Sequence, residues 1–167
     1  MLLIMSREGH VQLLKDSDWE RYRELRLRSL REDPDAFWNT YDEEVVLLEE
    51  DWRKRLSENP TFVAEHEGEY VGVATGCPHY DREGVAALVG MWVAPSARGR
   101  GLACVLIGEV IAWAREEGYP HLYLDVADEN AAAIKLYDRM GFRPTGVTNH
   151  MPSPRDHISE HEQGLEL

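Results

Sequence analysis

Residues 84–108 contain no acidic side chain, although the whole chain of 167 residues holds 31 Asp and Glu. The segment opens with an uncharged run, residues 85–93, whose apolar and β-branched side chains are typical of a buried strand. A loop rich in glycine and arginine follows at residues 95–101, and residues 102–117 then form a predicted helix that ends at Gly118. This succession of strand, tight loop and helix predicts a layered fold of helices on a sheet.

Six consecutive residues between this strand and this helix form a candidate anion site: Arg98, Gly99, Arg100, Gly101, Leu102 and Ala103. The first N–H groups of a helix are unpaired and carry about half a positive charge, so they bind anions. Glycine leaves the backbone open to a phosphate because it has no Cβ, and the two arginines add charge. A tight turn without a ligand is the alternative interpretation. The loop lacks the Gly-Lys-Ser/Thr of a P-loop, and Cys104 replaces the third glycine of a dinucleotide fingerprint.

The rest of the chain supplies further strands and helices without an internal repeat or a linker. Six more segments have strand patterns: residues 11–15, 61–65, 70–76, 122–126, 142–147 and 160–167. Three more have helical spacing and end signals: residues 19–31, 43–57 and 131–140. This order predicts a mixed α/β (α+β) fold, and the length favours one domain.

The net charge of −13 argues against DNA or RNA, whose binding requires Lys and Arg to neutralise phosphates. An acidic surface attracts cationic amines, although solubility alone would also account for it. No apolar run approaches the roughly 20 residues of a membrane helix, and Cys77 and Cys104 form no C-x-x-C pair. We therefore expect a cytoplasmic, reduced protein without nucleic-acid or membrane partners. The apolar start is too short for a signal peptide, and it leaves Met1 and Met5 as alternative first residues.

A second pattern occupies residues 130–142. Four residues recur at the spacing of one helix face: Ala133, Leu136, Tyr137 and Met140. Taken alone, Tyr137 is better explained as a core residue and Asn130 as a helix N-cap.

Together, the two patterns resemble the two signature motifs of the GNAT superfamily of N-acetyltransferases. The first motif, [Q/R]-x-x-G-x-[G/A], is matched by Arg98, Gly101 and Ala103. The second, N-x-x-A-x-x-L-Y-x-x-x-G-F, is matched by Asn130, Ala133, Leu136, Tyr137, Gly141 and Phe142. The order of the expected elements is also similar to that family from residue 11 onward. The resemblance implies that residues 1–167 form a single acyl-CoA N-acyltransferase domain.

The resemblance further implies a mostly antiparallel sheet of about seven strands with flanking helices. Its fourth and fifth strands, residues 85–93 and 122–126, would separate into a V-shaped gap. Acetyl-CoA would be the cosubstrate, with its pyrophosphate on residues 98–103 and its pantetheine arm in the gap. Backbone groups near Trp92 and Val93 would pair with the arm.

Two side chains of the second motif complete the implied site. Asn130 would hold the arm further along, and Tyr137 would reach the sulfur. An amine would attack the thioester directly in a ternary complex, and a backbone N–H near Val93 would stabilise the oxyanion. Tyr137 would be the general acid, since its ordinary pKa of about 10 lies within two units of the 8.5 of a thiol.

The general base is not evident from the sequence. Some members of the family carry a glutamate on the fourth strand, but residues 88–91 contain none. His79, Asp125 and Glu129 are candidates, each with a structural role as the stronger interpretation, and a relayed water or a neutral amine would also suffice. Cys104 lies inside a helix without a histidine nearby in sequence, so we expect it to pack rather than to act as a nucleophile.

The acceptor amine is expected between variable loops. Residues 33–40 combine aromatic and acidic side chains that could hold an amine or cap the core, and residues 150–159 could close the other side. His150, His157 and His161 fit no standard metal-site spacing, so no metal is expected. The sequence leaves open whether the acceptor is a small molecule or a peptide, and whether the protein is a monomer or a homodimer. A non-catalytic acyl-CoA-binding or sensor module is the alternative function.

Overall fold

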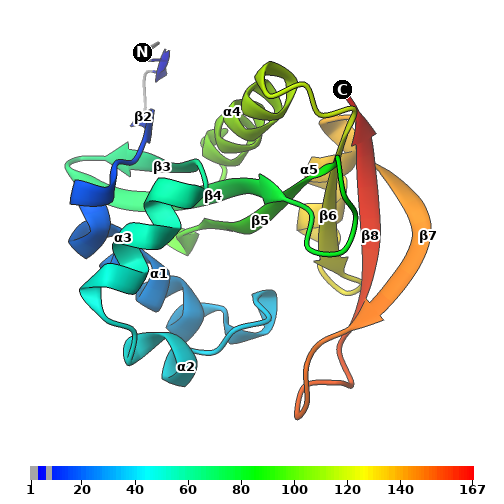
Figure 1. Cartoon of the computed structure of the whole chain (residues 1–167), viewed down its shortest axis with the longest axis horizontal. Helices are drawn as coiled ribbons and strands as arrows, with labels where there is room; N and C mark the ends of the chain where they lie inside the picture. The colour runs from blue at the N-terminus through cyan, green and yellow to red at the C-terminus, as the bar shows by residue number, and fades with distance from the viewer. Residues whose placement is uncertain (1–3, 7–8) are drawn as a thin grey trace.

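One sheet of eight strands organises the molecule, in the order β1-β2-β3-β4-β5-β6-β8-β7 (Figure 1). The computed structural model describes residues 4–6 and 9–167; the Met1 alternative lies outside the described residues. The strands are β1 (Ile4–Ser6), β2 (Gly9–Leu13), β3 (Thr61–His66), β4 (Glu69–Pro78), β5 (Ala86–Val93), β6 (His121–Ala127), β7 (Arg143–His150) and β8 (Ser159–Glu166). Neighbouring strands are antiparallel except β5 and β6, which are parallel. The predicted mixed, mostly antiparallel sheet is confirmed, and β1 adds an edge strand that the sequence pattern did not indicate.

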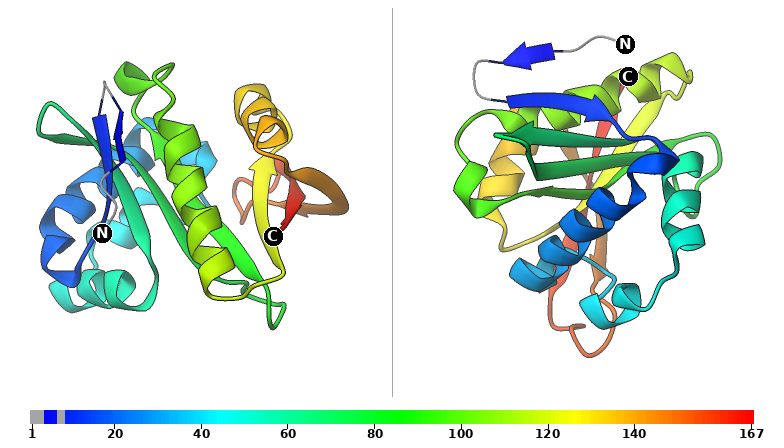
Figure 2. Two further views of the ribbon diagram at one scale, coloured as in Figure 1. Left: turned by 90° about the horizontal axis from the view of Figure 1, so that it is seen from above. Right: turned by 90° about the vertical axis from the view of Figure 1, so that its left-hand side faces the viewer.

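The sheet divides between β5 and β6. Among the described residues, these strands pair only at Ala86 with Leu122 and at Ala87 with Tyr123, and beyond that point they diverge. A β-bulge in β5 accompanies the separation, because three residues of β5 span the same distance as two residues of β4. Gly90 lies in this bulge with φ +63°, a conformation that favours glycine. The V-shaped gap implied by the family resemblance is therefore present, as Figure 2 shows from above.

Five α-helices cover the sheet. They are α1 (Trp19–Glu32), α2 (Tyr41–Val45), α3 (Glu49–Glu58), α4 (Leu102–Glu116) and α5 (Ala131–Arg139). In Figure 1, α4 lies above strands β3 to β5 and α1 to α3 lie below them. The inner face of α4 is buried through Leu102, Leu106, Ile107, Val110, Ile111 and Ala114. Burial of each large aliphatic side chain stabilises the fold by about 1.5–3 kcal/mol, which fixes the start of α4 against β5. No helix in the described part of the chain is long and apolar enough to span a membrane.

The single helix predicted over residues 43–57 is wrong, because the structure has two helices, α2 and α3, in this region. Leu48 is extended, with ψ 166°, and its N–H donates to the carboxylate of Asp51 at 2.9 Å. A reciprocal cap begins α2, where the backbone N–H of Thr40 donates to the Glu43 carboxylate at 2.8 Å and the Glu43 N–H donates to the Thr40 hydroxyl at 3.3 Å. Each cap satisfies helix-start donors at a separate point, so the chain restarts its helix at residue 49.

A buried ion cluster joins the first three helices. Glu44 is 1% exposed, and its carboxylate accepts hydrogen bonds from Arg26 at 2.9 and 3.0 Å and from Arg55 at 3.0 Å. Asn39 donates to the same carboxylate at 3.1 Å. Burial acts to raise the pKa of Glu44, but the hydrogen bonds and charges of the two arginines outweigh it and lower the pKa overall. The cluster anchors the end of the 33–40 loop, which borders the site.

Candidate active site

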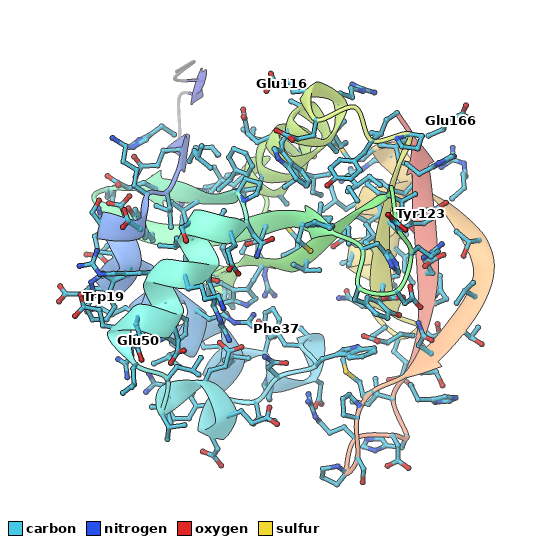
Figure 3. All side chains as sticks on the ribbon, viewed as in Figure 1. Trp19, Phe37, Glu50, Glu116, Tyr123 and Glu166 are labelled. Carbon is cyan, nitrogen blue, oxygen red and sulfur yellow. The ribbon has the colours of Figure 1, made fainter. Side chains whose placement is uncertain are left out.

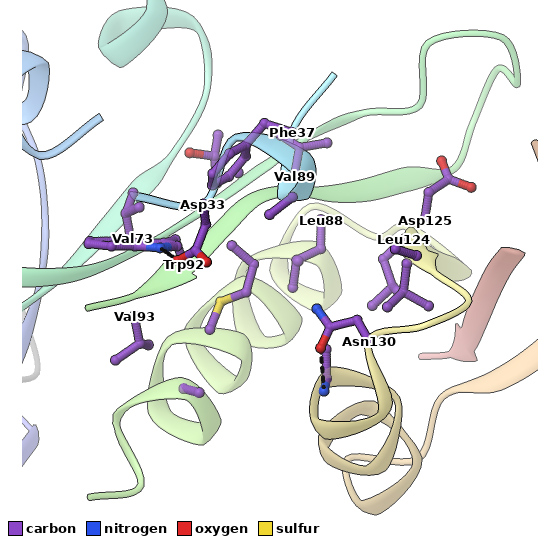
Figure 4. A pocket seen from close by; sticks show the side chains of 18 of the residues that line it. Asp33, Phe37, Val73, Leu88, Val89, Trp92, Val93, Leu124, Asp125 and Asn130 are labelled. Carbon is purple, nitrogen blue, oxygen red and sulfur yellow. Dashed lines mark hydrogen bonds between the residues drawn. The ribbon is translucent and has the colours of Figure 1, made fainter. Parts of the chain in front are cut away.

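A cavity of about 1730 Å³ follows the diverging edges of β5 and β6. One end lies at the start of α4 and the other lies between residues 33–40 and β8, so most of the residues predicted from the sequence meet here. Figure 4 shows Trp92 and Val93 on one wall and Leu124 and Asn130 on the other.

The glycine loop forms the anion-binding end of the cavity. Gly99 and Gly101 have φ +79° and +78°, and a Cβ added to either would have no heavy atom within 4 Å, so the space beside the loop is open. Gly101 is the N-cap of α4 and supplies no side-chain cap, which leaves the first N–H groups of the helix available. These open N–H groups at a helix start fit the pyrophosphate of acetyl-CoA.

The two arginines of the loop have structural partners. The Nε atom of Arg98 donates to the Val93 carbonyl and its Nη2 atom donates to Asp33, each at 2.9 Å. Arg100 lies 3.1 Å from His66 and does not line the cavity. Arg98, Gly99, Gly101, Leu102 and Ala103 do line it. The structure therefore brings five of the six predicted loop residues to the cavity and leaves Arg100 outside it.

The edge of β5 forms one wall. Trp92 is 4% exposed, and its indole N–H donates to Asp33 at 2.6 Å, a contact drawn in Figure 4. Val93 is buried beside it. Because β5 pairs with β6 only at Ala86 and Ala87 in the described part of the chain, the backbone of residues 88–93 has no strand partner there on the cavity side. An extended amide-containing arm could pair with this free edge.

Asn130 and Tyr137 reach the cavity from α5. The Oδ1 atom of Asn130 accepts from the Ala133 N–H at 3.2 Å, so the residue is an N-cap whose amide nitrogen remains available. Tyr137 is 6% exposed and packs edge-on against Phe142 with ring centroids 5.8 Å apart. Its hydroxyl has no hydrogen-bond partner in the described part of the chain, and burial raises its pKa far above the ordinary value. The phenol therefore keeps its proton and can donate a hydrogen bond to a group in the cavity.

The three base candidates occupy different environments. His79 is buried, and its ring nitrogens contact Asp81 and Arg82, each at 2.8 Å, which gives it a structural role. Glu129 lines the cavity but is exposed. Asp125 is half-buried in the cavity wall and accepts from Asn149 at 3.2 Å; burial, followed by nearby charge, raises its pKa.

Sequence reasoning missed Glu160, a fourth acidic residue of this wall. It lies on β8, is 4% exposed and accepts a 2.6 Å hydrogen bond from the Trp38 indole. Burial is the largest cause of its raised pKa, and the charge of Asp125 adds to the effect. Strand alternation over residues 160–167 places Glu160 and Glu162 on one face of β8, but nothing in the local sequence indicates that this face is buried.

The two loops predicted to border the acceptor contact each other. The guanidinium of Arg155 donates to the carbonyls of Pro34, Phe37 and Trp38 at 2.6–2.7 Å, which ties residues 150–159 to residues 33–40. The two aromatic side chains of residues 33–40 differ in exposure, so one caps the core and the other is exposed at the cavity. Phe37 is buried and Trp38 is 43% exposed. Figure 3 places Phe37 across from Tyr123, on the opposite wall of the cavity.

The histidines considered as metal ligands and Cys104 do not form a further site in the described part of the chain. Among the described residues, no three His, Cys, Asp or Glu side chains are grouped to hold a metal. His161 pairs with Asp128 at 2.7 Å, and His157 lines the cavity without His150. Cys104 is half-buried in the first turn of α4 and forms no disulfide within the described residues.

The comparisons with known proteins agree with this geometry. The family model described as the acetyltransferase (GNAT) family matches residues 19–142. An uncharacterized N-acetyltransferase of Methanocaldococcus jannaschii is 36% identical over 100 residues, which is 58% of this chain and 44% of that protein. The chain aligns with about half or less of the length of the curated relatives it matches.

Solved structures match the whole fold. The ribosomal-protein-alanine N-acetyltransferase of Brucella melitensis superimposes with a TM-score of 0.78 at 25% identity, covering 94% of this chain and 99% of that one. A Salmonella typhimurium protein, solved with its cofactor acetyl-CoA, superimposes with a TM-score of 0.76 at 21% identity, covering 95% and 94% of the two chains.

Proposed function

Since the chain belongs to the GNAT family of acetyltransferases, we propose that it transfers the acetyl group of acetyl-CoA to an amine in a ternary complex. One observation carries the proposal: the open glycine loop at the start of α4 leads directly to the unpaired edge of β5. An anion site followed by a free strand edge suits a ligand with a phosphate end and an amide-containing arm. We take residues 1–167 as one acyl-CoA N-acyltransferase domain.

The backbone would supply most of the cosubstrate contacts. The N–H groups at Leu102 and Ala103 would hold the pyrophosphate, and the edge near Trp92 and Val93 would pair with the arm. A fixed N–H near Val93 would also stabilise the oxyanion that develops as the amine attacks. Asn130 would use its free amide nitrogen to orient the arm from the opposite wall.

Tyr137 would act on the departing sulfur. The ordinary pKa of a phenol, about 10, already exceeds the 8.5 of a thiol, and burial widens this difference. Complete proton transfer to the thiolate is therefore uphill. We infer that Tyr137 donates a hydrogen bond that stabilises the charge developing on sulfur, while the proton lost by the amine neutralises the thiolate afterwards.

A thiol-release assay tests the proposal. Acetyl-CoA is incubated with the protein and with polyamines, amino acids, aminoglycosides or peptides, and free thiol is measured over time. Acceleration by at least one amine, with the acetylated product identified by mass spectrometry, is the expected result. Tight binding of coenzyme A by calorimetry without release with any amine would instead support a non-catalytic acyl-CoA-binding module.

A further inference from the structure

The end of the cavity away from α4 combines exposed aromatic rings with buried carboxylates. Trp38 and Tyr80 are 43% and 67% exposed, and their ring centroids lie 6.3 Å apart. Asp125 of β6 and Glu160 of β8 line the same cavity. In the β6–β8 register, Ala127 opposes Glu160 and Asp125 opposes Glu162, so these carboxylates share one face of the sheet.

Glu160 differs from the other buried glutamates in having no cationic partner. Within residues 10–167, three glutamates are at most 4% exposed: Glu44 at 1%, Glu162 at 3% and Glu160 at 4%. Glu44 pairs with Arg26 and Arg55, and Glu162 pairs with Arg82. Glu160 forms no ion pair in residues 10–167, and its Oε1 atom accepts no hydrogen bond there.

The neighbourhood of Glu160 does not supply the missing cation. Arg155 is close enough for its charge to lower the pKa of Glu160 somewhat, but its guanidinium donates to three backbone carbonyls instead. Asp125 adds a second negative charge, and its carboxylate accepts a hydrogen bond from the neutral amide of Asn149. A buried carboxylate is costly unless a cation and hydrogen bonds compensate it, so a ligand is the natural source of the positive charge.

The attacking amine does not supply a lasting positive charge. An amine attacks a thioester only in its neutral form, so the nitrogen that becomes acetylated gives up its charge. We propose that the acceptor is an amine with a second cationic group, which Glu160 and Asp125 hold beside the faces of Trp38 and Tyr80. The aromatic faces add cation–π attraction to the same group. This inference rests on the proposed acetyltransferase function and specifies its acceptor class.

Two amines of equal chain length test the proposal. Cadaverine carries a second ammonium group and pentylamine does not, and kcat/KM for each is measured by thiol release at saturating acetyl-CoA. The protein is expected to prefer cadaverine by at least roughly 10-fold. Glu160→Gln should lower kcat/KM for cadaverine by roughly 10- to 100-fold, as expected for loss of a hydrogen bond to a charged group, and that for pentylamine by less than about 3-fold.

Variants and a binding measurement separate the possible failures. Glu162→Gln is the matched control, because Glu162 is buried on the same face of β8 but outside the cavity, and the cadaverine preference should persist. Trp38→Ala, at a half-exposed position, should reduce the preference as Glu160→Gln does. Calorimetry with the coenzyme A complex should show weaker cadaverine binding in Glu160→Gln and in Trp38→Ala than in the wild type.

Equal kcat/KM for the two amines, or an unchanged preference in Glu160→Gln, would overturn the inference and leave the acetyltransferase proposal standing. Absence of thiol release with every amine would overturn the proposed function, and this inference with it.

Discussion

Tyr137→Phe separates the chemistry of the hydroxyl from the packing of the ring. Tyr137 is 6% exposed, and its ring packs against Phe142, a contact that phenylalanine preserves. Since the hydroxyl has no hydrogen-bond partner in the described part of the chain, its removal leaves no new unsatisfied group. We expect the free energy of unfolding to change by less than about 1 kcal/mol.

The catalytic effect should be much larger than the effect on stability. Loss of one hydrogen-bond donor to the charge that develops on the sulfur should lower turnover by roughly 10²-fold, which corresponds to about 2.7 kcal/mol of transition-state stabilisation. Affinity for acetyl-CoA should stay within a few-fold, because the hydroxyl acts on charge that develops during the reaction. Burial raises the pKa of Tyr137, so its ionisation should produce no break in the pH–rate profile below about pH 10.

The assay compares the wild type and Tyr137→Phe with two acetyl donors, acetyl-CoA and an acetyl thioester of a more acidic thiol. The loss of turnover should shrink with the second donor, because a better leaving group needs less stabilisation. Full activity of the variant with acetyl-CoA, or an equal loss with both donors, would refute the assignment. Melting temperatures measured in parallel separate a catalytic defect from unfolding.

Two further predictions concern binding and stability. Gly101→Asp should reduce the affinity for coenzyme A by at least roughly 10-fold in calorimetry, because it places a carboxylate at the proposed anion site. Gly68→Asp is the control for backbone strain, since Gly68 has a similar positive φ and similarly open surroundings. The Gly68→Asp variant should bind coenzyme A with the affinity of the wild type. Glu44→Gln should lower the free energy of unfolding by roughly 3 kcal/mol at pH 7, measured by denaturant unfolding. This value is near the lower limit for breaking a buried ion pair, because the side chain of Arg55 is 33% exposed. The folded state lowers the pKa of Glu44, so its contribution is present above the ordinary carboxyl pKa and is lost as the pH falls; the two stabilities should converge in acid.

The glycine loop was predictable because its causes are local, whereas the division of the sheet was implied only by the family resemblance. Gly99 and Gly101 both adopt positive φ, and their spacing before an apolar helix marks the loop directly in the sequence. The break between α2 and α3 was missed because the apolar run at residues 45–48 continues a helical pattern. The extended backbone at Leu48 interrupts it, and the Asp51 carboxylate accepts from the Leu48 N–H where the next helix begins.

Glu160 was missed for a different reason. A glutamate in a terminal strand is usually solvent-exposed, and nothing near it in sequence indicates otherwise. Its burial depends on Trp38, which lies 122 positions away and donates to its carboxylate. Periodicity does not reveal long-range contacts of this kind, so sequence motifs indicate the proposed cosubstrate half of the site but not the proposed acceptor half.

Asp33 joins these two halves. Its carboxylate accepts from the Trp92 indole at 2.6 Å and from Arg98 at 2.9 Å, and it begins the 33–40 loop that borders the acceptor end. The charge of Arg98 is therefore already balanced within the protein. In the proposed cosubstrate site, the attraction for a pyrophosphate would then come mainly from the N–H groups at the start of α4, and Arg98 would chiefly fix the glycine loop relative to β5 and residues 33–40.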